Sequence, residues 1–225
     1  INMRLVKNID SSPLEMRCLY MEKINYNERF KEFIKTLGDK KPSLLLHACC
    51  GPCLTYPLSV LVKYFNVTVL YVNPNIYPKE EYELRYKEVK RFVEEYSKDE
   101  GIKIDLVKED VPYEEYLDVV KGHEGDSEGG HRCLLCHWYR MDLAYSYASK
   151  NNFEYFTTVM TVSSKKPSQI LNEIGIELSK KYVNTKFLEA DFKKENGQLI
   201  GINIAKKYNL YRQCYCGCEF SYRSK

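Results

Sequence analysis

The feature that most constrains the fold is a short apolar run that ends in three cysteines. Residues 44–53 read Leu-Leu-Leu-His-Ala-Cys-Cys-Gly-Pro-Cys. The leucines predict a buried strand, and the Gly-Pro pair predicts a turn directly behind it. Neighbouring side chains of an extended chain point in opposite directions, so only a turn can gather Cys49, Cys50 and Cys53 on one side. The spacing therefore indicates ligands rather than packing residues.

The remaining sequence alternates apolar runs of strand length with amphipathic stretches of helix length. Strands are expected at residues 43–47, 67–72, 102–107, 155–160 and 186–188, and helices at 54–65, 79–98, 112–120, 133–149, 168–182 and 199–208. Such helices supply the crossover connections that parallel strands need. The pattern predicts an α/β fold, a three-layer sandwich with a mostly parallel Rossmann-type sheet over residues 43–225. Residues 1–42 are expected to be an N-terminal extension with one amphipathic helix at 27–37.

Five further cysteines fall into two groups, a CxxC pair at Cys133 and Cys136 and a CxCxC run at Cys214, Cys216 and Cys218. Ligand sites of open parallel sheets lie beyond the carboxyl ends of the strands, so the first turn and the CxxC pair are expected to meet there. The CxxC pair opens a helix, whose N-terminus favours thiolate over thiol. The glycine-rich residues 121–131 before it predict a flexible loop.

Four or five thiols that meet in one place fit an iron–sulfur cluster or a four-cysteine zinc site. The edge of a parallel sheet favours a cluster, because structural zinc usually occupies small loop-rich modules with two CxxC knuckles. Cysteines that act only as small buried hydrophobic residues are a third alternative, which the repeated clustering disfavours.

Other side chains add candidates for the chemistry. A disulfide closed over one residue is strained and easily reduced, so a disulfide between Cys216 and Cys218 would either carry electrons or fix the last part of the sequence in place. Cys18 has no partner at ligand spacing and is expected to be unrelated to the site. Candidate ligands or proton donors, each with a purely structural alternative, are His47, His131, His137, Asp126, Glu128 and Asp191.

Charge and composition narrow the class of protein. The net charge is +3, but residues 165–225 alone carry +6, which suits contact with a phosphate backbone or reflects only solvated lysines. No apolar run approaches the roughly 20 residues of a membrane span, and no export signal is recognisable. Nine cysteines at metal spacings fit a reducing compartment. A soluble, cytoplasmic protein without a membrane partner is expected.

Six stretches together resemble one known family, the epoxyqueuosine reductases called QueH, which complete queuosine in tRNA. The matching stretches are LLLHACCGPC (44–53), YVNPNIYPKEEY (71–82), RCLLC (132–136), TTVMTVSSKK (157–166), FLEADFKK (187–194) and YRQCYCGCEFS (211–221). The resemblance implies a nucleotide-hydrolase-like α/β fold, a [4Fe–4S] cluster with an additional iron ion, and a tRNA substrate. It places the metal-site cysteines at Cys49, Cys50, Cys133 and Cys136, with Cys53 at a less uniform position, and a disulfide pair at Cys216 and Cys218.

The predicted function is the two-electron reduction of an epoxide in tRNA to an alkene and water. The resemblance leaves open the electron donor, which could be ferredoxin-like, flavodoxin-like or a chemical reductant, and Asp191 is our candidate catalytic carboxylate. Cys214 and the N-terminal extension depart from a minimal family member. Two alternatives are an iron–sulfur thiol or heterodisulfide reductase, and a non-catalytic, zinc-stabilised RNA-binding module.

Overall fold

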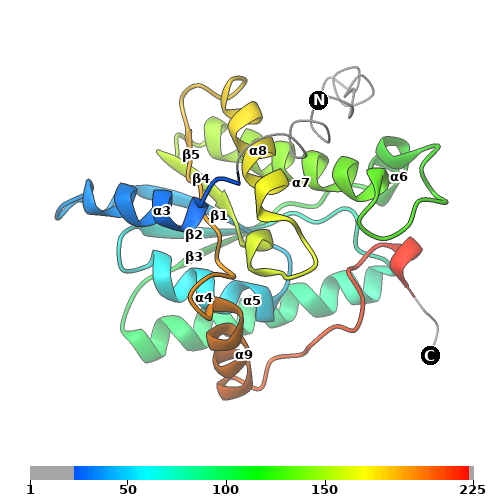
Figure 1. Ribbon diagram of the computed structural model, residues 1–225. Helices are drawn as coiled ribbons and strands as arrows, with labels where there is room; N and C mark the ends of the chain where they lie inside the picture. Colours follow the sequence, from blue (N-terminus) through cyan, green and yellow to red (C-terminus); the bar gives the residue numbers. More distant parts are fainter. Residues whose placement is uncertain (1–22, 223–225) are drawn as a thin grey trace.

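The computed structural model describes residues 23–222, and its centre is a parallel β-sheet (Figure 1). The five strands lie in the order β3 (Asp105–Lys108), β2 (Asn66–Tyr71), β1 (Ser43–Ala48), β4 (Tyr155–Thr158) and β5 (Lys186–Phe187). All four strand pairs are parallel. The predicted Rossmann-type sheet is confirmed, and the direction of strand order reverses at β1.

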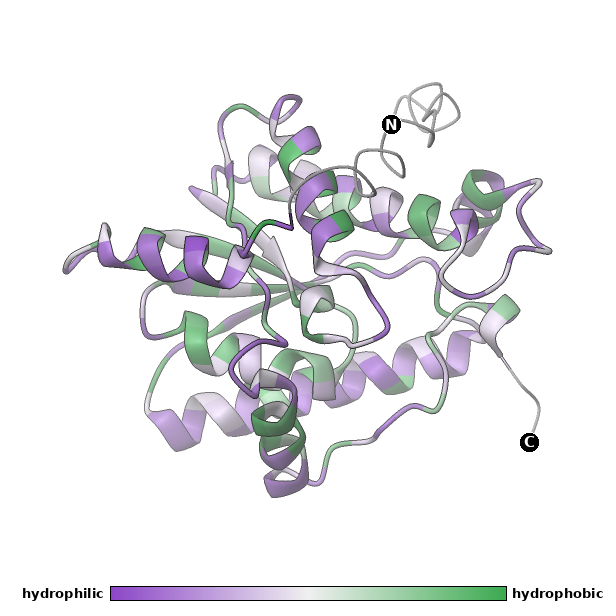
Figure 2. Ribbon diagram, in the orientation of Figure 1, coloured by the Kyte–Doolittle hydropathy of each residue, from purple (hydrophilic) through white to green (hydrophobic). Residues whose placement is uncertain are grey.

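Helices cover both faces of this sheet and complete the predicted three-layer sandwich. One core contains Leu44 and Leu46 of β1, and the other contains Leu45, as expected for side chains that alternate across a strand. The first core packs under α3 (Tyr26–Lys35), α4 (Gly51–Leu61), α5 (Lys79–Glu100) and α9 (Gly197–Lys207), and the second under α7 (His131–Lys150) and α8 (Ser168–Ser179). The short α6 (Tyr113–Val120) packs on α7. Hydrophilic and hydrophobic residues are interspersed along α3 and α5 in Figure 2, in keeping with helices buried on one side.

The first helix after the sheet begins earlier than predicted. We expected it at residue 54, but α4 starts at Gly51, with Cys50 as its extended N-cap residue and Pro52 in its first turn. Proline fits the start of a helix because it lacks an N–H that would be unpaired there in any case. Cys53 therefore belongs to the first helical turn rather than to a loop.

The fourth strand is shorter than predicted. It ends at Thr158, whose side chain accepts a hydrogen bond from the Met160 amide and so begins a 3-10 turn, η1 (Val159–Val162). The long α5 ends as predicted at Gly101, which adopts a left-handed conformation with φ of 64°.

The predicted N-terminal helix is present as α3 and packs on the sandwich. Phe30 and Phe192 make an edge-to-face ring contact at 5.9 Å, and Arg29 forms an ion pair with Glu189 at 2.8 Å. The division of the chain at residue 42 stays a prediction, and Cys18 lies outside the described residues. Among residues 23–222, no helix has the length and apolarity to cross a membrane.

The loop before α7 is held by one side chain. The Arg132 guanidinium donates hydrogen bonds to the carbonyl oxygens of His123, Glu124 and Asp126. The glycines predicted a flexible loop in residues 121–131, and the structure shows that its backbone wraps around a buried arginine. Arg132 immediately precedes Cys133, so these bonds also place the start of α7.

Candidate metal centre

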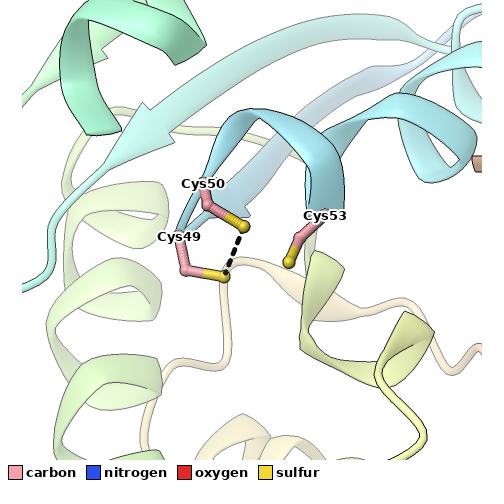
Figure 3. Close-up of side chains that lie close together, drawn as sticks. All are labelled: Cys49, Cys50 and Cys53. Atoms are coloured by element: carbon pink, nitrogen blue, oxygen red, sulfur yellow. Dashed lines mark hydrogen bonds between the residues drawn. The ribbon is translucent and has the colours of Figure 1, made fainter. Parts of the chain in front are cut away.

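Three cysteine sulfurs meet at the turn between β1 and α4 (Figure 3). The Sγ atoms of Cys49 and Cys50 are 4.0 Å apart, and those of Cys49, Cys50 and Cys53 all lie within 4.8 Å of one another. The extended Cys50 reverses the chain into the helix, so side chains that would diverge along a strand converge here. This cysteine triad offers three soft ligands at one point and could hold a metal ion.

The triad lies at a cavity of about 520 Å³ beyond the carboxyl end of β1. Its wall is built from α4, the start of α7, the residues after η1, α9 and residues 209–222, which we call the C-terminal segment. The cysteines that line the cavity are Cys49, Cys53, Cys133, Cys214 and Cys216. Thiols from three distant parts of the sequence therefore face one space; the sheet topology predicted the meeting of the first turn and the CxxC pair, but not the third group.

The CxxC pair lies on α7 next to this cavity. Cys133 lines it and accepts a hydrogen bond from the Gly129 amide at 3.3 Å, whereas Cys136 is buried behind it with Tyr139 and Cys218. Within residues 23–222, no three metal-ligating side chains other than the triad approach one another within 4.8 Å. The CxxC pair thus shares the cavity with the triad without joining it at ligand spacing.

The protonation of the thiols differs from our expectation. Burial raises the pKa of Cys133, and it raises the pKa of Cys136 to about 12, so without a metal the helix N-terminus does not make them thiolates. In the triad, hydrogen bonds from Cys50 and Cys53 hold the pKa of Cys49 well below its ordinary value. Burial in turn raises the pKa of Cys50 to about 12. The three sulfurs therefore differ in acidity, with Cys49 the most readily ionised, and a metal would have to displace the protons that the others hold.

The C-terminal segment brings the third cysteine group to the site. Cys216 lines the cavity, and Cys218 is buried near Cys136 and Tyr116. Both are free thiols, so the disulfide stays a prediction. Arg85 on α5 fixes this part of the chain, since it donates to the carbonyl oxygens of Cys216 at 2.9 Å and Tyr215 at 3.3 Å.

The candidate histidines take different positions. His47 is completely buried and bonded to Thr158 and the Val72 carbonyl, and burial lowers its pKa to about 3, which fits the structural alternative. His137 lines the cavity, and its buried Nδ1 has no hydrogen-bond partner in the described part of the chain. His131 is stacked on His123, with ring centres 4.3 Å apart, and does not line the cavity.

The three candidate carboxylates also occupy different positions relative to the cavity. Glu128 lines the cavity, whereas Asp126 caps the backbone amide of Arg132. Asp191 does not line it; the buried Asp191 carboxylate accepts a hydrogen bond from Ser168 at 2.7 Å and pairs with Lys193 at 3.4 Å. Ser168 opens α8 directly after cavity residues Lys166 and Pro167, so Asp191 supports the cavity wall from behind.

Sequence reasoning missed several residues of the site. Gln213 donates a hydrogen bond to the Cys50 sulfur at 3.0 Å. The side chain of Arg140 is buried close to the cysteines, and Lys166 lines the cavity. Arg140 could have been found, because it follows Cys136 by four residues and so lies on the same face of α7. Gln213 and Lys166 gave no such signal, since only the tertiary fold brings them to the sulfurs.

Basic side chains surround the cavity. Lys165, Lys166, Lys206 and Arg212 line it, against the single carboxylate of Glu128. None of these four cations forms an ion pair with another described residue. Part of the basic C-terminal third is therefore concentrated at this opening, where it favours an anionic ligand.

Comparisons with known proteins identify the family of this chain. Residues 44–224 match the family model described as "Epoxyqueuosine reductase QueH". The chain belongs to the QueH family. Three relatives, each named "Epoxyqueuosine reductase QueH", come from Streptococcus pyogenes serotype M1 (39% identical), Staphylococcus aureus (37%) and Staphylococcus epidermidis (35%). The alignments cover 89% of this chain in all three cases, and 79%, 85% and 85% of the respective relatives.

Membership of the QueH family confirms the resemblance predicted from the six sequence stretches. The matched region contains all five elements that line the cavity and every cysteine from Cys49 to Cys218. The two alternatives, a heterodisulfide reductase and a zinc-stabilised RNA-binding module, receive no comparable support.

Proposed function

We propose that the protein reduces the epoxide of epoxyqueuosine in tRNA to the alkene of queuosine, the reaction after which its relatives are named. The observation that carries the proposal is the cysteine triad at a basic cavity in a chain of the QueH family. In this reaction two electrons and two protons cleave both C–O bonds of the epoxide, and its oxygen leaves as water. The site must therefore deliver reducing equivalents and protons to one carbon–oxygen unit.

The cofactor we infer is a [4Fe–4S] cluster held by Cys49, Cys50, Cys133 and Cys136, with an additional iron ion near Cys53. The donor set supports this, because sulfur is the ligand that iron–sulfur clusters require and five thiols lie at or beside one cavity. When bound, such a centre would supply single electrons and a Lewis acid for the epoxide oxygen. The chain itself has to keep the thiols together and exclude water from them.

Three further residues, Cys216, Cys218 and Asp191, would help to supply the electrons and protons of the reaction. Cys216 and Cys218 together can give up two electrons and two protons by forming a disulfide, and an external donor of the ferredoxin or flavodoxin type would then reduce it again. Their positions, one at the cavity and one behind it, support a relay from the interior to the substrate. Asp191, the predicted catalytic carboxylate, would act on the cavity through Ser168, whose hydroxyl donates a hydrogen bond to it at 2.7 Å.

The substrate would enter from the basic side. Phosphates on either side of the modified nucleotide would contact Lys165, Lys206 and Arg212, and the ring of Tyr215 in the cavity wall offers a face for stacking. The modified base would have to leave the stack of its loop, which single-stranded loops allow at low cost.

The test is anaerobic reconstitution with iron and sulfide, followed by an assay on tRNA that bears epoxyqueuosine. We expect iron binding, brown colour and formation of queuosine. A matched control is Cys214→Ser, since Cys214 is exposed and outside the proposed ligand set, and this variant should keep both iron and activity. A protein that binds zinc alone, or that binds iron without converting the tRNA, would refute the proposed function.

A further inference from the structure

Three buried arginines of this protein differ in how their charge is compensated. Arg85, Arg132 and Arg140 are each at most 3% exposed. Arg85 pairs with Glu81 at 2.7 Å and also binds two carbonyl groups, and Arg132 binds three carbonyl groups of its loop. Arg140 donates a hydrogen bond to the neutral Asn73 Oδ1 at 2.7 Å and lies within hydrogen-bonding reach of Cys136, and its buried Nε has no partner. Within residues 23–222 it forms no ion pair with a carboxylate.

The groups that face Arg140 are sulfurs. Cys133, Cys136 and Arg140 follow one another at i, i+3 and i+7 and so share one face of α7. Cys136, Cys49 and Cys216 are the groups near Arg140 that can become negative, and when ionised they raise the pKa of its guanidinium in spite of burial. The two nearby imidazoles, His47 and His137, carry no negative charge in either protonation state and so cannot balance it.

The hydrogen bond from Arg140 to Asn73 also leads to the cysteine triad. Asn73, its acceptor, donates in turn to the Ala48 carbonyl at 2.9 Å, directly before Cys49. A second positive charge, that of Lys166, faces Cys216, Cys49 and Cys53 from the other wall of the cavity. The interior of the site is therefore positively charged unless several sulfurs are thiolates.

An unpaired guanidinium in the interior is costly, because desolvation of a buried ion amounts to several kcal/mol after relaxation. A nearby anion offsets that cost when the two charges are close and well hydrogen-bonded, whereas a buried charge left without a partner is strongly destabilising. A cluster with four thiolate ligands carries such an anionic charge, and it becomes more negative on reduction.

We propose that Arg140 is the internal counter-ion of the metal centre: its positive charge, and not its hydrogen bond to Asn73, stabilises the thiolate ligands and the electron added on reduction. The inference rests on the proposed iron site. It makes Arg140 a positioning and charge-balancing residue, since the substrate cavity is lined by other side chains.

Two substitutions separate charge from hydrogen bonding. Arg140→Lys keeps the charge, whereas Arg140→Gln keeps a donor for Asn73 and removes the charge. Each full-length variant is loaded anaerobically with iron and sulfide and then challenged with increasing concentrations of an iron chelator. We expect Arg140→Gln to lose its iron at about 10-fold to 100-fold lower chelator concentration than the wild type, the range known for outer-shell partners, and Arg140→Lys to stay close to the wild type. The midpoint potential of Arg140→Gln should shift to more negative values.

A matched control is Arg85→Gln, which removes an equally buried but fully paired arginine. Without metal, Arg85→Gln should melt at a lower temperature than Arg140→Gln, because only Arg140 is uncompensated in that form. Equal iron retention in Arg140→Gln and the wild type would overturn the proposal, and so would equal losses in both Arg140 variants or failure of metal-free Arg140→Gln to fold. If the wild type itself binds no iron, the proposed function fails instead.

Discussion

Replacing Arg85 with methionine is expected to detach the C-terminal segment from α5 while the sandwich stays folded. Methionine keeps an unbranched apolar stem in the buried position but removes the guanidinium that holds the carbonyl groups of Tyr215 and Cys216. The same change removes the ring contact of the guanidinium with Tyr215, where Cζ lies 5.1 Å from the ring centre.

The magnitude follows from these contacts. Hydrogen bonds that involve a charged group contribute about 1.5–3 kcal/mol each, and such effects are rarely additive for neighbouring bonds. Two of them cross from Arg85 to the C-terminal segment, so we take about 3 kcal/mol for the free energy of opening. At about 1.4 kcal/mol for each factor of ten, the open population rises about 100-fold.

The assay is alkylation of individual cysteines in the metal-free, reduced protein, followed by mass spectrometry. Cys218 is 6% exposed and should react about 100-fold faster in Arg85→Met, in proportion to the open population. Cys214 is exposed in the closed segment and should change little, so it serves as an internal control. Lys90→Met, on the outer side of α5, is the matched control variant. A Cys218 rate within a factor of about three of the wild type would refute the argument, because it would mean that Arg85 does not hold the segment.

Three further predictions concern the metal, the substrate and the fold. Cys133→Ser and Cys136→Ser should each abolish the brown colour and the reduction of epoxyqueuosine together, as read by absorbance and by nucleoside analysis; full activity in either variant would contradict the cluster assignment. Lys165→Ala combined with Lys206→Ala should weaken tRNA binding and lower the slope of log affinity against log salt by about two, one for each lost phosphate contact, whereas an unchanged slope would remove these lysines from the interface. Gly175→Ala places a methyl group 2.2 Å from the Phe187 ring and should lower the free energy of unfolding by about 1–3 kcal/mol, as measured with heat or urea. An unchanged free energy of unfolding would show that β5 moves to make room for the methyl group.

The fold was largely predictable because the period of the apolar residues changes along the chain. The alternation in β1, with Leu44 and Leu46 in one core and Leu45 in the other, requires helices on both faces, and the sequence supplies them. The boundaries of the elements were less predictable, because they depend on local conformation that the period of the apolar residues does not report. Cys50 begins α4 with an extended backbone, and Thr158 begins η1 with a side-chain hydrogen bond.

The site was predictable where its ligands are close in sequence. Cys49, Cys50 and Cys53 share a turn whose residues are consecutive, so their convergence follows from local geometry. The relation of that turn to Cys136 and Cys218 depends on how α7 and the C-terminal segment pack, and the protonation of the thiols depends on burial, which outweighed the helix N-terminus. Gln213 belongs to the same class, because its role appears only when distant elements are in contact, whereas Arg140 shares a face of α7 with Cys136 and could have been found from the sequence.

The order in which the chain is synthesised has a consequence for how the site is assembled. The cysteine triad and the CxxC pair leave the ribosome before the C-terminal segment, which carries Gln213, a residue that bonds to Cys50 and lines the cavity. Until that segment has docked on α5 through Arg85, the cavity lacks one wall and the earlier thiols face the solvent from that side. The thiols are therefore most open to a metal before the C-terminal segment has docked, and docking completes the wall of the cavity around them.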